Sequence, residues 1–155
     1  MRKIALLIAT VGGIGKFPFC PGTVGTIPGV VLWWFTTLLP FSLFVIVLVQ
    51  ICLFVLLFII GLWSSTKAER IIGKKDPSEV VIDEAVSPLI TFIAMPFSWP
   101  VLLIGFILNR FFDILKPFPI NRLQKLKSGW GIMADDVASG IVSAAVLHII
   151  YYFFF

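Results

Sequence analysis

The fold of this chain is decided by Met95-Pro96-Phe97-Ser98-Trp99-Pro100, which lies near the middle of residues 85–109, a segment without charged side chains. This segment is either one membrane-spanning helix or two shorter helices joined by a turn. Its prolines favour the turn, because proline lacks a backbone N–H and disfavours helical conformation in the residue before it. The sequence therefore predicts a helical hairpin, with arms at about residues 85–95 and 99–112.

The placement of charges also favours the hairpin. A single span would put Lys116 and the basic residues after it on the membrane face opposite Lys67 and Arg70, whereas basic residues tend to stay on the cytoplasmic side. A hairpin places all 12 basic and all 8 acidic residues on one face. Each arm covers only about half of a hydrocarbon core of roughly 30 Å, at about 1.5 Å per residue. We therefore expect the arms to extend above the lipid or to be buried within the bundle.

The composition indicates that most of the chain lies in lipid. Hydrophobic residues make up 59% of the 155 residues and charged residues only 13%, unlike a water-soluble globule. Residues 17–66, which also lack charges, are too many for one helix, since about 20 apolar residues span a bilayer. We predict an all-α fold, a polytopic helical membrane bundle with a cytoplasmic N-terminus. It is expected to form one domain over residues 1–155 with about five membrane helices, at about residues 23–39, 41–63, 85–95, 99–112 and 137–155.

Other classes of protein fit the sequence less well. The N-terminus resembles a short signal sequence, but its apolar stretch is barely long enough and no clear cleavage site follows it. The net charge of +4 is spread between apolar segments, so no nucleic-acid partner is expected. A transporter would carry ionisable groups at mid-membrane, where the only such residue is His148. A scaffold protein would leave the acidic residues without a role.

Two acidic pairs, Asp83-Glu84 and Asp135-Asp136, are each expected at the start of a membrane helix. Helix capping is the simpler interpretation, and it explains one carboxylate at each helix better than two. Two pairs at the same depth are more typical of oxygen ligands for a hard divalent cation. These four carboxylates are therefore candidate metal ligands.

A third acidic residue, Asp113, shares a predicted helix face with Arg110 and Lys116, because the three are spaced three residues apart. Pro117 then ends the helix. A ladder of interfacial salt bridges would explain this pattern. The alternative is a metal or catalytic role for Asp113, with the two basic side chains binding a phosphate dianion. Carboxylates and cations together favour phosphoryl transfer.

A glycine-containing segment, Pro21-Gly22-Thr23-Val24-Gly25-Thr26, precedes the first long helix. Glycine lets a backbone approach an anion closely at a helix N-terminus. Thr23 and Thr26 are therefore candidate substrate contacts, although helix capping by Thr23 explains the segment equally well. The chain has no Asp-x-Asp motif and no cysteine-phosphatase loop, which leaves metal-assisted hydrolysis as the favoured reaction.

The sequence resembles the phosphatidylglycerophosphatase A family. The resemblance covers most of the chain and is carried by the segments at residues 21–26, 81–84, 112–120 and 129–140. It departs from the family at Ser87-Pro88 and Ser128-Gly129, where glycine is usual. It implies Mg²⁺-dependent removal of the terminal phosphate from phosphatidylglycerophosphate. The enzyme would be a multi-pass protein of the bacterial inner (cytoplasmic) membrane, with its active site on the cytoplasmic face and a phospholipid of the bilayer as substrate.

The resemblance also implies roles for individual residues. Asp113, Asp136 and Lys116 are expected to be catalytic. Arg110, Lys116, Thr23 and Thr26 are expected to contact the substrate, and the expected Mg²⁺ ligands are Asp83, Glu84, Asp135 and Asp136. Mg²⁺ usually takes only one or two direct carboxylates, so some of these must act indirectly or as a general base. Another lipid phosphate, such as phosphatidic acid, is the alternative substrate, and the sequence leaves the oligomeric state open.

Overall fold

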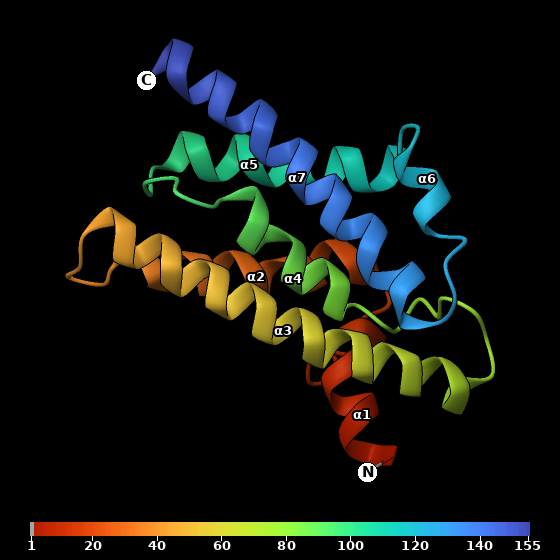
Figure 1. Cartoon of the computed structure of the whole chain (residues 1–155). Coiled ribbons are helices and arrows are strands. Elements are labelled where there is room, and N and C mark those ends of the chain that lie inside the picture. The colour runs from red at the N-terminus through yellow and green to blue at the C-terminus, as the bar shows by residue number, and fades with distance from the viewer. Residues whose placement is uncertain (1) are drawn as a thin grey trace.

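The computed structural model describes residues 2–155, and all the regular secondary structure in this part of the chain is helical, as predicted. Figure 1 shows the helices packed side by side, with both termini at the periphery. Seven α-helices and one 3₁₀ helix follow each other along the chain: α1 (Arg2–Ala9), η1 (Ile14–Lys16), α2 (Pro21–Thr37), α3 (Leu43–Ile72), α4 (Ile82–Thr91), α5 (Trp99–Leu115), α6 (Ile120–Leu123) and α7 (Gly129–Phe154).

The number of helices differs from the predicted five. The additional helices, α1 and α6, are 8 and 4 residues long, too short to stand out in a search for long apolar segments. Helix α1 buries Ala5 and Ala9, and the carbonyl of Ala9 accepts a 2.9 Å hydrogen bond from the backbone N–H of Val81, just before α4. The predicted cytoplasmic side for the N-terminus stays a prediction.

Two helix boundaries also differ from the expected ones. Helix α3 continues beyond residue 63 to Ile72, through Lys67 and Arg70, and ends at Gly73, whose φ of 74° is typical of a glycine helix end. Helix α7 begins at Gly129 instead of residue 137. In both cases the prediction placed the helix boundary at the boundary of the apolar run. Charged residues interrupt an apolar run but do not interrupt a helix.

Two helices, α3 and α7, are long and apolar enough to cross a membrane. Most of the apolar side chains along α3 are not covered by other helices, among them Leu43, Phe44 and Ile59. Soluble monomers rarely expose such a continuous apolar surface. The chain therefore has the composition and surface expected of a helical protein in contact with lipid.

The chain reverses direction between α4 and α5, at the proline-containing stretch singled out in the sequence (Figure 1). Ser98 is the N-cap of α5 and accepts a 3.3 Å hydrogen bond from the backbone N–H of Val101. Pro100 occupies the first turn, where a missing N–H costs no helical hydrogen bond. This reversal brings the start of α4 toward the end of α5.

Helices α2 and α4 pack at close range because α2 presents glycines to α4. A Cβ atom at Gly29 would lie 2.0 Å from the backbone oxygen of Ala85, and one at Gly22 would lie 2.0 Å from Oε1 of Glu84. Only glycine allows this approach. Trp33, farther along α2, stacks on Phe92 with ring centroids 4.3 Å apart. The glycines of α2 are thus explained by helix packing.

A buried polar network joins α4, α5 and α7. Nδ2 of Asn109 donates to Oγ of Ser87 at 2.7 Å and to Oγ1 of Thr91 at 2.8 Å. The hydroxyl of Ser87 then donates to the backbone oxygen of Asp136 at 2.9 Å. Buried hydrogen bonds of this kind hold elements in one arrangement, because an unpaired polar group would be costly there. The network therefore positions the three helices that carry most of the acidic residues.

Candidate active site

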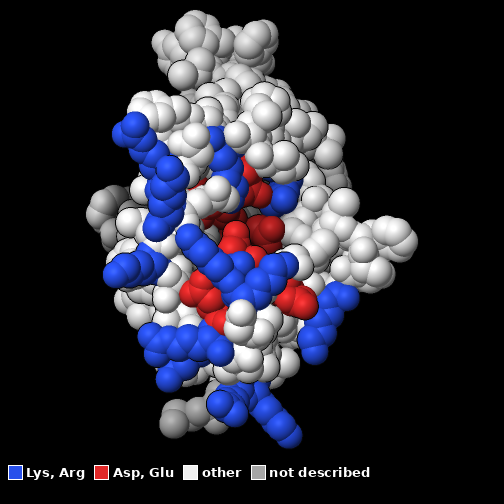
Figure 2. Space-filling view, turned by 90° about the vertical axis from the view of Figure 1, so that its right-hand side faces the viewer, with Lys and Arg blue, Asp and Glu red and all other residues white. Residues whose placement is uncertain are grey.

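The acidic residues singled out in the sequence meet at one cavity. It has a volume of about 380 Å³ and lies where the start of α2, the loop before α4, and helices α4, α5 and α7 converge. Figure 2 shows acidic side chains gathered in a hollow, with basic side chains around them. The charged residues that line the cavity are Asp76, Asp83, Glu84, Asp113, Lys116, Asp135 and Asp136.

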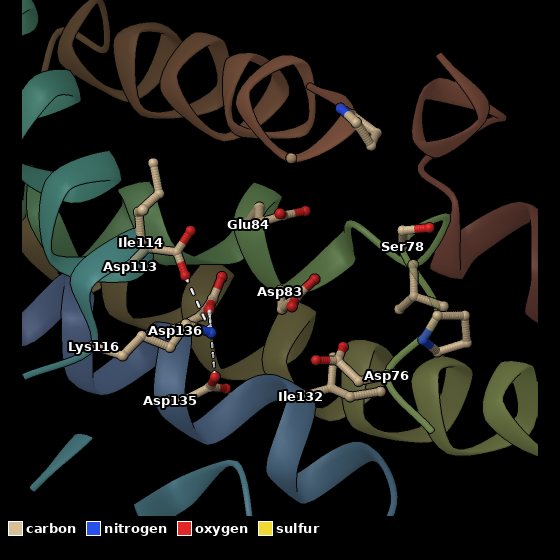
Figure 3. A pocket seen from close by; sticks show the side chains of 14 residues that line it. Asp76, Ser78, Asp83, Glu84, Asp113, Ile114, Lys116, Ile132, Asp135 and Asp136 are labelled. Carbon is tan, nitrogen blue, oxygen red and sulfur yellow. Dashed lines mark hydrogen bonds and ion pairs between the residues drawn. The ribbon is translucent and has the colours of Figure 1, made fainter. Parts of the chain in front are cut away.

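Lys116 places a cation among three carboxylates, as Figure 3 shows. Its Nζ contacts Asp135 and lies 3.4 Å from Oδ1 of Asp113 and 3.5 Å from Oδ1 of Asp136. The residue follows the last turn of α5 in a left-handed conformation, with φ of 40°. Pro117 comes next and cannot continue the helix. The end of α5 thus directs this side chain across to α7.

Arg110 forms a second cationic centre, next to two of the carboxylates. Its Nη1 lies 2.8 Å from Oδ2 of Asp113 and 3.9 Å from Oε1 of Glu84. It also donates a 3.3 Å hydrogen bond to Oγ1 of Thr26. Arg110 is not among the residues that line the cavity. It orients two carboxylates, and its predicted contact with the substrate stays a prediction.

The two threonines proposed as substrate contacts lie outside the cavity lining. Thr26 is buried and donates a 3.0 Å hydrogen bond to the backbone oxygen of Gly22. Thr23 does not cap α2, because the N-cap position belongs to Cys20 and has no side-chain hydrogen bond. Of this segment, only Pro21 and Gly22 reach the cavity. The structure therefore does not bring Thr23 and Thr26 to the acidic residues' cavity.

Helix capping does not explain the two acidic pairs. Asp135 and Asp136 lie beyond the first turn of α7, which contains no acidic residue. Asp83 and Glu84 do lie in the first turn of α4, but its N-cap is Val81 and no side-chain cap is formed. The expectation that Asp135-Asp136 begin a helix is thus wrong, because α7 starts earlier. Their position is instead fixed by packing on α4 and α5.

Several carboxylate oxygens at this site are buried and have no hydrogen-bond partner. They are Oδ1 of Asp83, Oε2 of Glu84, Oδ1 of Asp135 and Oδ2 of Asp136. An unpaired carboxylate oxygen out of contact with water is costly. Such a set of unpaired oxygens therefore marks a place where a cation or a ligand with hydrogen-bond donors would be bound.

Burial also changes the acidity of the carboxyl groups on α4. It raises the pKa of Asp83 well above its usual range, and the charges of Glu84 and Asp76 add to the rise. Burial raises the pKa of Glu84 to about 7, although the charge of Arg110 opposes the rise. Desolvation disfavours the ionised form of each group. A bound cation would therefore stabilise the ionised form of both carboxyl groups.

The charge of Lys116 is stabilised in spite of its burial. Burial alone would lower the pKa of the ammonium, but the carboxylates of Asp136 and Asp135 outweigh this effect and raise it above its ordinary value. Lys116 is therefore a fixed positive charge at neutral pH.

The side chains fit Mg²⁺ in their chemistry, because they offer carboxylate oxygens, which this ion prefers. Among residues 2–155, however, no group of three or more histidine, cysteine or acidic side chains is arranged to hold a metal ion. Mg²⁺ usually keeps several waters and binds one or two carboxylates. One or two of the unpaired carboxylate oxygens, which belong to Asp83, Glu84, Asp135 and Asp136, would be enough for such a site.

Sequence reasoning missed Asp76 and Asn109. Asp76 lines the cavity from the loop before α4, with φ of 49°, and nothing in its local sequence distinguishes it from a surface loop residue. Asn109 is buried in the network beneath the site. A signal did exist for Asn109: it is a polar residue in an apolar segment, one helical turn before Asp113.

Comparison with known proteins adds to this geometry. The sequence model of the family described as Phosphatidylglycerophosphatase A matches residues 7–151. A protein of that name from Escherichia coli is 33% identical over 93% of this chain and 81% of its own length. A second, from Haemophilus influenzae, is 39% identical over 98% and 94%. A Bacteroides thetaiotaomicron protein, provisionally named phosphatidylinositol-3-phosphatase, is 37% identical over 90% and 89%. No solved structure matches the chain.

Proposed function

This chain belongs to the phosphatidylglycerophosphatase A family, and we propose that it removes the terminal phosphate of phosphatidylglycerophosphate, giving phosphatidylglycerol and inorganic phosphate. The relatives from E. coli and H. influenzae, which are named for this activity, support the choice of substrate. The observation that carries the proposal is the cavity in which Lys116 meets Asp113, Asp135 and Asp136. A site with both signs of charge can bind a phosphate and activate a water molecule.

The lysine and the carboxylates have different tasks in this proposal. Lys116 donates hydrogen bonds to the phosphate and stabilises the charge that develops during the reaction. Asp83, Glu84, Asp135 and Asp136 provide the oxygens that hold Mg²⁺, not all of them directly. Bound Mg²⁺ neutralises phosphate charge and lowers the pKa of water. Arg110 holds Asp113 and Glu84 in place.

The reaction adds water to phosphorus and breaks the bond between phosphorus and the glycerol oxygen. Asp113 and Asp136 are the proposed catalytic carboxylates, because both line the cavity next to Lys116. One of them accepts a proton from the attacking water, and this proton is passed to the glycerol oxygen as it leaves. A positioned carboxylate base of this kind contributes roughly 10²–10⁴-fold to a rate.

The surface beside the cavity supports a lipid substrate. Ile114 lines the cavity and is 70% exposed, and Phe118, shortly after Lys116, is 68% exposed. An apolar rim next to a charged hollow suits a molecule with a phosphate head and hydrocarbon tails. We place the protein in the bacterial inner membrane as a multi-pass protein, with α3 and α7 in lipid and the cavity on the cytoplasmic face. The acyl chains stay in the bilayer while the headgroup enters the cavity.

A second substrate class is favoured by one relative. The B. thetaiotaomicron protein is as similar to this chain as the two phosphatidylglycerophosphatases are, yet its name refers to an inositol lipid. The alternative is therefore the same hydrolysis on another lipid phosphomonoester, with phosphatidic acid as the simplest case.

A panel of lipid phosphates tests the choice of substrate. The purified protein in detergent micelles would be incubated with phosphatidylglycerophosphate, phosphatidic acid and phosphatidylinositol 3-phosphate, with Mg²⁺ or with EDTA. We expect phosphate release to be fastest from phosphatidylglycerophosphate and to require Mg²⁺. Faster release from either of the other two lipids would overturn the proposed substrate, and full activity in EDTA would overturn the proposed Mg²⁺ dependence.

A further inference from the structure

The ammonium of Lys116 occupies a position among carboxylates that is suited to a cation. It contacts Asp135 and lies 3.4 Å from Asp113 and 3.5 Å from Asp136 (Figure 3). Lysine is a compact point charge with three donors on a flexible stem. Its ammonium thus offsets part of the negative charge of the cluster, and it lies among carboxylates that a metal ion would use.

The carboxylates retain unpaired oxygens next to this ammonium. Oδ1 of Asp135 and Oδ2 of Asp136 have no hydrogen-bond partner, and each of these residues is only 2% exposed. Oδ1 of Asp83, another residue that lines the cavity, is also unpaired. One ammonium therefore satisfies only part of the cluster. A divalent cation brings twice the charge and more coordination positions, so it would satisfy the cluster better.

The side chain of Lys116 is less enclosed by the fold than those of Asp135 and Asp136. It follows the last residue of α5, and its side chain is 20% exposed, against 2% for those of Asp135 and Asp136. The aspartates lie within α7, and the backbone oxygen of Asp136 is tied to α4 through Ser87. A cation entering the cluster would therefore displace the lysine side chain and leave the helices in place.

From this arrangement we propose that Lys116 is an internal counter-ion of the cation site, which gives way when Mg²⁺ binds and then binds the substrate phosphate. The two positive charges repel each other at short range, so only one of them can occupy the cluster. The inference rests on the proposed function, and it adds an order of events: the phosphate-binding cation becomes available only after Mg²⁺ is bound. The enzyme would thereby avoid holding its substrate without the metal.

Metal affinity of a lysine variant tests this competition. Mg²⁺ binding to the purified protein in detergent, without substrate, would be measured by titration calorimetry for the wild type and for Lys116→Met. Methionine keeps much of the side-chain length and removes the charge. We expect Lys116→Met to bind Mg²⁺ at least about tenfold more tightly, because its competitor is gone, while lipid phosphate hydrolysis is lost.

Two further variants control the titration. Lys125→Met removes one positive charge from an exposed residue that does not line the cavity, and its affinity is expected to equal that of the wild type. Asp136→Asn is expected to lose most of the binding. Equal or weaker Mg²⁺ binding by Lys116→Met than by the wild type would overturn this inference alone. Mg²⁺ binding by neither protein would overturn the proposed cofactor as well.

The wild-type protein allows a second measurement that does not depend on a folded variant. Acetylation of lysine side chains by an amine-reactive ester would be followed by mass spectrometry with and without Mg²⁺. An ammonium held among three carboxylates reacts slowly, so Mg²⁺ is expected to speed modification of Lys116 several-fold and to leave Lys125 unchanged. Slower or unchanged modification of Lys116 with Mg²⁺ would contradict the displacement.

Discussion

Glu84 shows at the scale of single residues how the site is built at the expense of stability. Its carboxyl group is largely buried beside Arg110, which lies 3.9 Å away, and burial raises its pKa to about 7 from an ordinary value of 4.5. Between these two values the folded chain binds more protons than the unfolded chain. The free energy of unfolding therefore falls as pH rises through this range.

The pH dependence of the melting temperature checks this effect. In detergent with EDTA, the wild type is expected to lose stability relative to Glu84→Gln as pH rises from about 5 to about 8, because only the wild type must ionise a buried group. Asp83 titrates in both proteins, and the charge of Glu84 contributes to its raised pKa. The difference between the two proteins therefore reports on Glu84 together with its effect on Asp83. A difference that is constant, or that grows in favour of the wild type as pH rises, would be inconsistent with a raised pKa.

Asn109 is expected to matter although it does not line the cavity. Asn109→Leu removes the hydrogen bonds to Ser87 and Thr91 and should reduce the free energy of unfolding by about 1–3 kcal/mol. It should also lower kcat more than it raises KM, because Ser87 supports the backbone at Asp136. Asn121→Leu, the same change at an exposed residue of α6, serves as the control. Equal effects of the two changes on stability and kcat would show that the network has no positioning role.

At the scale of helices, the contact between α2 and α4 depends on glycine. Gly29→Ala should destabilise the protein, because the new Cβ would lie 2.0 Å from a backbone oxygen that cannot move aside. Helix propensity alone predicts the opposite, a gain of about 1 kcal/mol. Gly61→Ala is the matched control, since its Cβ would meet the flexible end of the Met133 side chain. Thermal unfolding of both variants decides the question, and a stabilised Gly29→Ala would rule out the close packing.

The long helices and the turn could be predicted from the sequence, because apolar length and proline act locally. The start of α7 and the end of α3 could not be predicted, because each helix extends beyond its apolar run. The carboxylates of the site stood out because charged residues are rare in this chain. Asp76 and the network around Asn109 did not stand out, because their roles depend on which helices pack against one another. The pairing of Lys116 with α7 likewise depends on the left-handed conformation at the end of α5.

At the scale of the whole molecule, a charged cavity lies beside long apolar helices. The orientation in a membrane that the composition implies can be measured directly. Cysteine labelling in intact and opened cells would do this in a variant without Cys20 and Cys52. Pro96, exposed in the turn before α5, is replaced by cysteine in one variant and Lys127 in another.

We expect a membrane-impermeant reagent to label position 96 from outside the inner membrane and position 127 only after the membrane is opened. Basic residues tend to remain cytoplasmic, and the turn lies at the far end of α5 from Lys116. Labelling of both positions from the same side would contradict the proposed orientation. The assignment of the catalytic residues would not be affected, because it rests on the cavity.

The central claim is that the carboxylates of this cavity hydrolyse a lipid phosphomonoester. Its most direct test is phosphate release from phosphatidylglycerophosphate by purified wild type and by Asp136→Asn, measured side by side with Mg²⁺. Glu79→Gln, at an exposed acidic residue outside this cavity, is the matched control. We predict that Asp136→Asn remains folded and loses at least about a hundredfold in kcat, the range expected for a catalytic carboxylate, while Glu79→Gln keeps wild-type activity. Wild-type turnover by folded Asp136→Asn would contradict the account.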